Sequence, residues 1–264
     1  MTSPSVSHAF VVPAYGRSPH LAACLASLRE QRHRSPILVC TSTPCDGLAE
    51  VVASFDARLI VHGPNRGIGH DWNQALRHAD ADWVTLAHQD DVYLSEFAQA
   101  TLHAIGRHPD ALLVLTGYGE LLGEQTRLWT PMLAIKRLML ELGFLGRESV
   151  SSVGAKRRPL RFGCPIPCPS VTLRRTGEAS WFREDLRLNL DWDAWLRLSL
   201  QPGAFVYLRN TLMLHRIHAG SETSDGVRDG RRAQEDRMMF QSLWPGPIAA
   251  LLTRVYAASY EAGH

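Results

Sequence analysis

The sequence lacks a long apolar run and an excess of either charge. None of its apolar stretches approaches the ~18 residues of a membrane span, and its first ten residues lack the positive and apolar regions of a signal peptide. Lysine and arginine number 28 against 26 acidic residues, whereas a nucleic-acid-binding surface needs clustered basic charge. We therefore expect a cytoplasmic protein with a small or locally recognised ligand and no nucleic-acid partner.

Cysteine is scarce and irregularly spaced. The five cysteines form no CxxC pair, and Cys164 and Cys168 stand four apart among prolines, which is a poor pattern for a structural zinc site. Reduced thiols are the better interpretation. With 45% hydrophobic and 20% charged residues, the chain has the composition of a globular protein, so we do not expect disorder.

Short apolar runs alternate with helical patterns over the first half of the chain. We expect buried strands at residues 8–13, 36–40, 58–62, 83–87 and 111–117. Ser18 and Pro19 have the pattern of an N-cap and first turn for the helix that follows the first strand. Strands that alternate with helices in this way predict an α/β fold with a mostly parallel central sheet and helices on both faces.

The second half is less regular. We expect helices at 130–148, 190–200 and 244–260, and strands at 204–208 and from residue 211. No linker-like composition separates the halves, so we predict a single domain over 1–264. Within it we distinguish residues 8–115, residues 116–225, and C-terminal helices at 226–264.

Two adjacent acids, Asp90 and Asp91, end the fourth predicted strand. Neighbouring carboxylates repel each other and are costly to desolvate unless a positive charge lies between them. In parallel sheets, ligands bind beyond the carboxyl ends of the strands, which is where this pair lies. The pair is therefore either a solvated turn or a site for a cation, and we favour the cation.

Four segments in order resemble the family 2 glycosyltransferases of the GT-A fold. They are FVVPAYGRSPHLAACLASLREQ (10–31), GPNRGIGHDWNQALRHADADWVTLAHQDD (63–91), LDWDAWLRL (190–198) and HRIHAGSET (215–223). The resemblance implies a nucleoside-diphosphate sugar donor, transfer with inversion to a hydroxyl of a glycan, lipid-linked or small-molecule acceptor, a Mg²⁺ or Mn²⁺ ion, and a role in polysaccharide biosynthesis. It also implies that residues 8–115 bind the nucleotide sugar and that residues 116–225 bind the acceptor.

The resemblance also assigns the donor-binding residues. They come from the loop after the first strand, the segment after the second, and the glycine-containing turn before the third helix: Pro13, Tyr15, Arg17, Thr41, Asn65, Gly67 and Asn73. Tyr15 offers a ring to a nucleobase, and glycines let the backbone approach a ligand closely. Thr41 stands where the family usually has an acid, which leaves the identity of the base open.

The acid motif reads His88-Gln89-Asp90-Asp91, with histidine in the first acidic position. By resemblance, Asp90 and Asp91 bind the metal together with His218, while Gln89, Asp90 and Arg216 contact the donor. Two carboxylates suffice for Mg²⁺, which usually keeps several waters and substrate phosphates as ligands.

The resemblance places the catalytic base at Asp191, at the start of the helix that begins with Leu190 in place of the usual Glu. Transfer with inversion needs a carboxylate that takes the proton of the attacking hydroxyl. Trp192 and Asp193 are further candidates for substrate contact, although both patterns also suit a core aromatic and a helix-start acid.

Several alternatives stay open. A sugar-phosphate nucleotidyltransferase would have a glycine-rich loop with Arg and Lys after the first strand, which PAYGRSPH does not provide. The altered positions at Thr41, His88 and Leu190 also suit a non-catalytic nucleotide-sugar-binding protein. The amphipathic helix at 133–147 and the basic run at 156–161 suggest peripheral contact with the inner face of a membrane, or only a packed helix and a solvated loop. The helix at 244–260 is a candidate homodimer surface.

Overall fold

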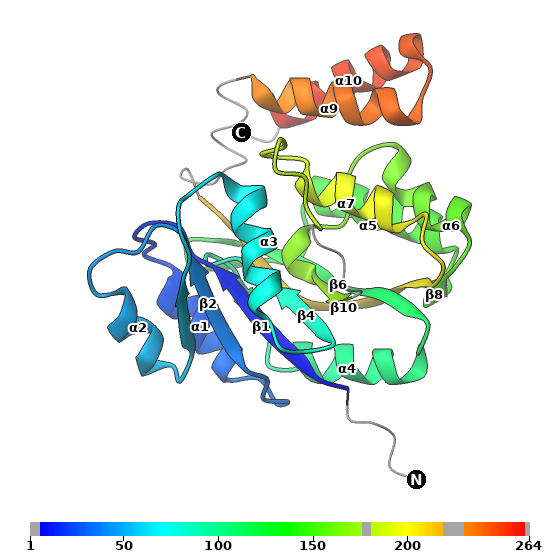
Figure 1. Ribbon diagram of the computed structural model, residues 1–264. Coiled ribbons are helices and arrows are strands. Elements are labelled where there is room, and N and C mark those ends of the chain that lie inside the picture. The colour runs from blue at the N-terminus through cyan, green and yellow to red at the C-terminus, as the bar shows by residue number, and fades with distance from the viewer. Residues whose placement is uncertain (1–5, 176–180, 219–229, 262–264) are drawn as a thin grey trace.

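The amino-terminal half alternates strands and helices as predicted. The computed structural model describes residues 6–175, 181–218 and 230–261. In it, four parallel strands form one side of the sheet (Figure 1). These strands are β1 (His8–Pro13), β2 (Ile37–Thr41), β3 (Arg58–Val61) and β4 (Trp83–Leu86), and the helices between them are α1 (Leu21–Arg29), α2 (Leu48–Ser54) and α3 (Ile68–His78).

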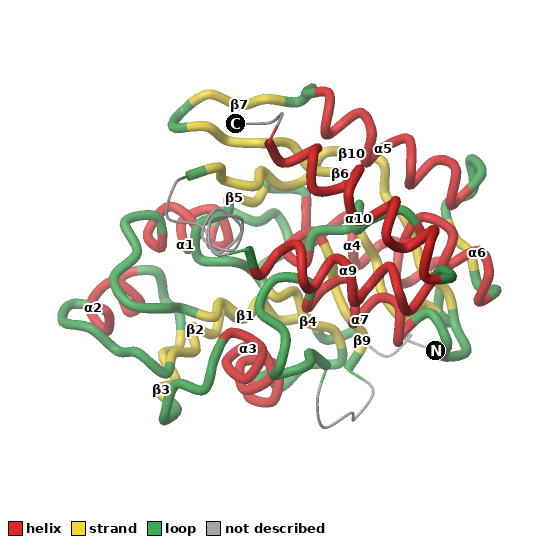
Figure 2. Tube along the Cα trace, turned by 90° about the horizontal axis from the view of Figure 1, so that it is seen from above, coloured by secondary structure: helices red, strands yellow, loops and turns green. Residues whose placement is uncertain are grey.

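The remaining elements extend the same sheet and cover it. In chain order they are β5 (Val92–Tyr93), α4 (Phe97–Arg107), β6 (Ala111–Leu122), β7 (Gln125–Arg127), α5 (Pro131–Phe144), β8 (Ser149–Val150), α6 (Val153–Arg157), η1 (Arg158–Arg161), η2 (Cys168–Ser170), β9 (Val171–Arg174), α7 (Leu190–Leu198), β10 (Ala204–Ile217), α9 (Arg231–Leu243) and α10 (Gly246–Glu261). Figure 2 shows α9 and α10 side by side, close to α7.

The order of strands brings the ends of β4 and β10 to one edge of the sheet. The order is β3-β2-β1-β4-β9-β6-β10-β5. Because β9 is antiparallel to both β4 and β6, and β10 is parallel to β6, the strands β4, β6 and β10 all run in the same direction. The segments that follow β4 and β10 therefore leave the sheet on the same side, which positions the site described below.

Alternate residues of β1 enter different layers of the core. Ala9 and Val11 pack with residues of α3 and α7, whereas Phe10 and Val12 pack with residues of α1 and α2. This is the period-two pattern of a strand that is buried on both faces. The predicted α/β fold, with a mostly parallel sheet and helices on both faces, is confirmed.

Three predicted elements differ from the structure. The two expected strands at 204–208 and from 211 are one strand, β10, whose register with β6 shifts between Leu208 and Thr211. Helix α1 starts after His20 and not after Ser18, whose hydroxyl accepts a hydrogen bond from the His20 N–H at 3.2 Å. Helix α5 ends at Phe144, because Leu145 and the following glycine adopt positive φ.

Two further observations bear on the predicted organisation. Of the helices that the structure describes, none combines the length and the apolar character needed to cross a membrane. The predicted boundary near residue 225, and the part of the fourth motif from residue 219 onward, lie outside the described residues.

Candidate functional site

Asp91, in the turn between β4 and β5, is a buried hydrogen-bond acceptor. Its side chain is 0% exposed, and its Oδ1 accepts hydrogen bonds from His215 Nδ1 (3.0 Å) and from the Arg216 backbone N–H (2.9 Å). Its Oδ2 is buried and has no hydrogen-bond partner among the described residues. A solvated turn does not account for a carboxylate in this environment.

Asp90 bonds to residues at the end of β10 and just after it. Its Oδ2 lies 2.9 Å from His218 Nε2, and its carbonyl oxygen accepts a hydrogen bond from Arg216 Nε at 2.8 Å. Burial alone would raise the pKa of Asp90, but the charges of His88 and His215 and the hydrogen bond from His218 together hold it below its ordinary value. Asp90 is therefore ionised at neutral pH.

His88 completes a cluster that suits a divalent ion. One potential ligand atom from each of His88, Asp90 and Asp91 lies within 4.8 Å of the others. The imidazole ring lies against Trp72, with centroids 4.8 Å apart. Burial lowers the pKa of His88, while the charges of Asp91, Asp90 and Asp191 oppose that shift. Because carboxylate oxygens and neutral imidazole are both metal ligands, the unpaired Oδ2 of Asp91 fits an ion here.

The loop after β1 is held against the acid motif. The Tyr15 N–H donates to Gln89 Oε1 at 3.1 Å, and the Gly16 N–H donates to Thr43 Oγ1 at 2.8 Å. The Tyr15 side chain is 60% exposed, so its ring is accessible to a ligand. Arg17 lies farther out, where its guanidinium donates to the Asp46 carbonyl oxygen at 3.1 Å.

The glycine-containing turn before α3 has a local cause. Asn65 Oδ1 accepts a hydrogen bond from the Gly67 N–H at 2.8 Å, and Gly67 has φ 103°, which favours glycine. Both residues are exposed. Asp71, in the first turn of α3, accepts a hydrogen bond from Ser42 at 2.5 Å, while its Oδ1 is buried without a partner in the described part of the chain.

Asp191 lies in the first turn of α7. Its Oδ1 accepts a hydrogen bond from the Trp192 N–H at 2.7 Å. Burial raises the pKa of Asp191, and that N–H and the charges of Arg232, Lys136 and His88 offset part of the rise. His88 interacts electrostatically with Asp191 as well as with the acid pair.

Four predicted contact residues are buried, and their side chains bond within the protein. Trp192 is 0% exposed, and its indole N–H donates to the Leu160 carbonyl oxygen at 2.9 Å, so no sugar can lie against it. Thr41 is 1% exposed, and its hydroxyl accepts a hydrogen bond from a backbone N–H two residues on. Asn73 is buried and bonds to the backbone of 181–182. Asp193 pairs with Arg197 at 2.7 Å.

Sequence reasoning left three histidines near the acids unassigned, and it gave Lys136 no role. His215 bonds to Asp91, His88 belongs to the acid cluster, and the His20 ring lies 5.1 Å from that of His218. The only signal in the sequence was the position of His88, where the resemblance expects an acid. The others come from segments that only the folded chain brings together.

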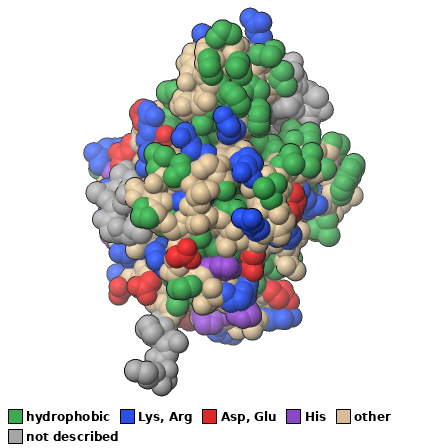
Figure 3. Space-filling model, turned by 90° about the vertical axis from the view of Figure 1, so that its right-hand side faces the viewer, with side chains coloured by type: hydrophobic (Ala, Val, Ile, Leu, Met, Phe, Trp, Pro, Cys, Tyr) green, Lys and Arg blue, Asp and Glu red, His purple; other side chains and the backbone are tan. Residues whose placement is uncertain are grey.

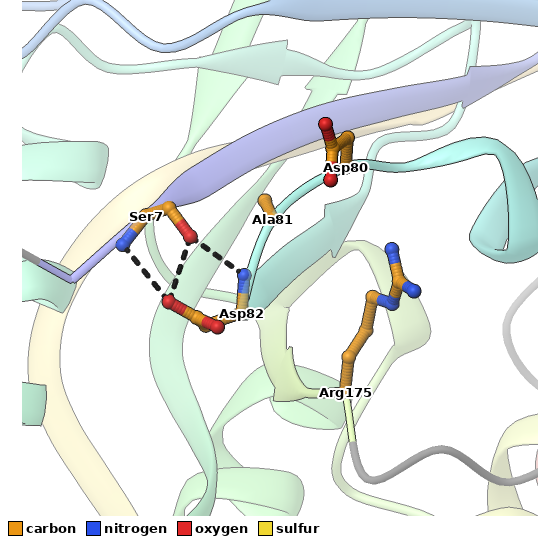
Figure 4. A pocket seen from close by; sticks show the side chains of 5 residues that line it. All are labelled: Ser7, Asp80, Ala81, Asp82 and Arg175. Atoms are coloured by element: carbon orange, nitrogen blue, oxygen red, sulfur yellow. Dashed lines mark hydrogen bonds between the residues drawn. The ribbon is translucent and has the colours of Figure 1, made fainter.

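A separate pocket of about 230 Å³ lies at the opposite edge of the sheet. Its lining comprises Ser7, Asp80, Ala81, Asp82 and Arg175 (Figure 4). Ser7 Oγ donates to Asp82 Oδ2 and accepts from the Asp82 N–H, each at 2.8 Å. Ser7 precedes β1, residues 80–82 precede β4 and Arg175 follows β9, so the pocket lies away from the predicted site residues. The bonds between Ser7 and Asp82 join the starts of the two strands.

Comparison with known proteins identifies the family of the chain. The family model described as glycosyl transferase family 2 matches residues 9–175. An uncharacterized glycosyltransferase of Haemophilus influenzae (strain ATCC 51907 / DSM 11121 / KW20 / Rd) is 30% identical over 99 residues, which are 35% of this chain and 37% of that protein. The aligned region thus spans little more than a third of that relative.

Two solved structures share the fold at low sequence identity. Staphylococcus aureus TarS 1–349 in complex with UDP-GlcNAc has a TM-score of 0.67 and 14% identity, covering 94% of this chain and 70% of that one. The mannosyltransferase PcManGT from Pyrobaculum calidifontis, in complex with GDP-Man and Mn²⁺, has a TM-score of 0.65 and 15% identity, covering 95% and 69%. The GT-A-like fold and the family match over residues 9–175 agree, and the chain belongs to glycosyl transferase family 2.

Proposed function

We propose that this protein transfers a sugar from a nucleoside-diphosphate sugar to an acceptor hydroxyl, with inversion at the anomeric carbon. One observation carries the proposal: the two acids that follow β4 bond directly to residues at the end of β10. Asp91 bonds to His215 and Arg216, and Asp90 bonds to Arg216 and His218. Acids held beside an arginine and two histidines at the carboxyl ends of parallel strands suit a metal-bound diphosphate.

Asp90, Asp91 and His218 would hold a Mg²⁺ or Mn²⁺ ion. The buried and unpaired Oδ2 of Asp91, for which the described residues supply no donor, supports this assignment. When bound, such an ion neutralises the charge that develops on a departing diphosphate. Arg216 adds a second positive charge, and its hydrogen bonds to the Asp90 carbonyl and to the Gly123 carbonyl (3.3 Å) hold its side chain beside the acids.

Asp191 would act as the base. Its carboxylate takes the proton of the acceptor hydroxyl while the hydroxyl oxygen forms a bond to the anomeric carbon. The bond from that carbon to the diphosphate oxygen breaks, and the diphosphate leaves with the electron pair. A raised pKa improves a carboxylate as a base as long as it remains ionised at the working pH.

The donor would lie over the carboxyl ends of β1 to β4. Tyr15 would stack on the base, while Pro13, Arg17, Asn65, Gly67 and Gln89 would shape the pocket around it. The TarS complex with UDP-GlcNAc and the PcManGT complex with GDP-Man support a nucleoside-diphosphate sugar as the class of donor. They differ in the base, so a panel of donors is needed.

The acceptor side would include the exposed face of α5. Ile135, Leu138 and Leu142 are exposed at helical spacing, and the basic Arg158 is exposed nearby. Such a face fits an anionic lipid surface, where lipid-linked acceptors are found. Lys156 does not contribute to this contact, because it is 1% exposed and donates to two backbone carbonyls at 2.5 and 2.9 Å.

Vesicle binding tests this contact. Leu138→Glu would reduce cosedimentation with vesicles that contain anionic lipid, whereas Val51→Glu, on the exposed side of α2, would not. Equal binding of both variants to these vesicles would contradict the membrane assignment.

The exposed side chains of α10 would form the homodimer surface. Ile248, Leu251 and Val255 are exposed at helical spacing. Figure 3 shows one face of the molecule, and over its upper part, where α9 and α10 lie, apolar side chains gather with lysines and arginines among them. Light scattering would show a dimer for the wild type and a monomer for Leu251→Glu. A wild type that is monomeric would contradict this surface.

The donor assay tests the function itself. The protein would release nucleoside diphosphate from at least one nucleotide sugar in the presence of Mn²⁺ and an acceptor, and Asp191→Asn would bind that donor without turning it over. A protein that binds the donor equally in both forms but never turns it over would be the non-catalytic binder. Release of pyrophosphate from a nucleoside triphosphate and a sugar phosphate would identify a nucleotidyltransferase.

A further inference from the structure

His88 presents an unused imidazole nitrogen to the acid pair. Its Nε2 is buried and has no hydrogen-bond partner within the described residues. The Asp91 Oδ2 is in the same condition, and these two residues form one group with Asp90 in which the ligand atoms lie within 4.8 Å of each other. Buried polar atoms without partners are costly, and a cation bound by this group of residues would satisfy them.

The spacing and the support of the ring suit coordination. Two ligands on opposite sides of an ion with bonds of ~2.1 Å lie ~4.2 Å apart, so a group within 4.8 Å closes on an ion with a small shift. The ring rests on Trp72, and the His88 carbonyl oxygen accepts a hydrogen bond from the Asp91 N–H at 3.2 Å. These contacts fix His88 in the turn that also carries both acids.

We propose that His88 is itself a ligand of the divalent ion, and that its nitrogen shifts the preference of the site from Mg²⁺ toward Mn²⁺ and later transition metals. This inference rests on the metal site of the proposed function. Mg²⁺ prefers oxygen ligands in near-octahedral geometry, whereas imidazole suits transition metals. A site with His88 and His218 beside two carboxylates is correspondingly less suited to Mg²⁺ than a site built from acids alone.

Pulsed electron paramagnetic resonance of Mn²⁺ bound to the full chain, without donor, tests the coordination directly. Nitrogen coupling to Mn²⁺ would persist in His218→Gln, because His88 remains, and would disappear in the double variant His88→Asp/His218→Gln. His33→Asn, a substitution of an exposed histidine before β2, would leave the coupling unchanged and serves as the matched control.

A competition titration tests the preference. His88→Asp would improve displacement of Mn²⁺ by Mg²⁺ at least about tenfold relative to the wild type, the scale on which changes around a metal site alter affinity. Unfolding curves of each variant show whether the fold is retained, and His88→Asn serves as a second variant if His88→Asp does not fold.

Three results would overturn the inference. Nitrogen coupling that is absent from His218→Gln, coupling that is equally strong in His218→Gln and in the double variant, or an unchanged Mg²⁺ to Mn²⁺ preference in His88→Asp would each exclude His88 as a ligand while leaving the metal site itself in place. A wild-type protein that binds no Mn²⁺ at all would remove both His88 as a ligand and the metal of the proposed function.

Discussion

Replacing Asp191 with asparagine should abolish transfer and stabilise the protein at the same time. A positioned general base typically contributes 10²–10⁴-fold to a rate, so we expect turnover to fall by that factor, which corresponds to about 2.7–5.4 kcal/mol of transition-state stabilisation. Asparagine keeps the shape and can still accept the hydrogen bond from the Trp192 N–H.

The gain in stability follows from the raised pKa of Asp191. Burial raises it above its ordinary value of 3.8, so the native state binds more protons than the unfolded state between the two values. The free energy of unfolding therefore falls as pH rises through that window, and the full penalty is present above the folded pKa. Asn carries no charge and avoids this penalty at neutral pH.

Two measurements check this prediction. Release of nucleoside diphosphate reports turnover, and urea denaturation at pH 7 reports stability. Asp193→Asn is the matched control, since it removes a carboxylate that is paired with Arg197 and should lower stability. Turnover of Asp191→Asn within about threefold of the wild type, or a lower free energy of unfolding for that variant, would refute the reasoning.

Three other predictions concern the core and the acids. Gly69→Ala should lower the free energy of unfolding by about 1–3 kcal/mol, because the new Cβ would lie 2.6 Å from a backbone carbonyl oxygen. Gly106→Ala, whose Cβ meets no described atom within 4 Å, should raise it by about 0.4–1 kcal/mol. Urea denaturation measures both, and equal effects would contradict this packing. Burial, helped by the charge of His33, lowers the pKa of His8 to about 3, so protonation favours the unfolded state and stability should fall by up to about 1.4 kcal/mol per pH unit below 6.5. His8→Asn should flatten the dependence of stability on pH, and an unchanged slope would show that His8 does not cause it. Mn²⁺ should raise the melting temperature of the wild type but not that of Asp91→Asn, and an equal rise in both would exclude Asp91 as a ligand.

The sequence predicted the first half of the fold well because most of its strands are continuous apolar runs. Their apolar runs differ sharply from the amphipathic helices between them, as in β1 and β4. The predicted burial is wrong for β3, where Arg58 and Val61 are exposed because that strand lies at the edge of the sheet. The joined strand β10 was predicted as two because the polar pair at 209–210 interrupts the apolar run at the register shift. The strands β5, β7 and β8 have only two or three residues and give no periodic signal.

Site residues were harder to predict, because spacing along a helix does not distinguish a ligand contact from packing. Trp192 and Asn73 stand in matching motif positions, yet their side chains bond to backbone carbonyls in the interior. The acid pair was predicted from local sequence, since adjacent carboxylates need compensation wherever they lie. Its partners His215 and His88 depend on how β10 and β4 lie in the sheet, which no local pattern specifies.

The most direct measurement of the central claim is anomalous X-ray scattering from crystals grown with Mn²⁺ and a nucleoside diphosphate. We predict one strong Mn²⁺ peak within bonding distance of Asp90 and Asp91, with the diphosphate oxygens on its far side and the Tyr15 ring beside the base. Diphosphate density at that position without a Mn²⁺ peak, or a peak elsewhere on the protein, would contradict the account.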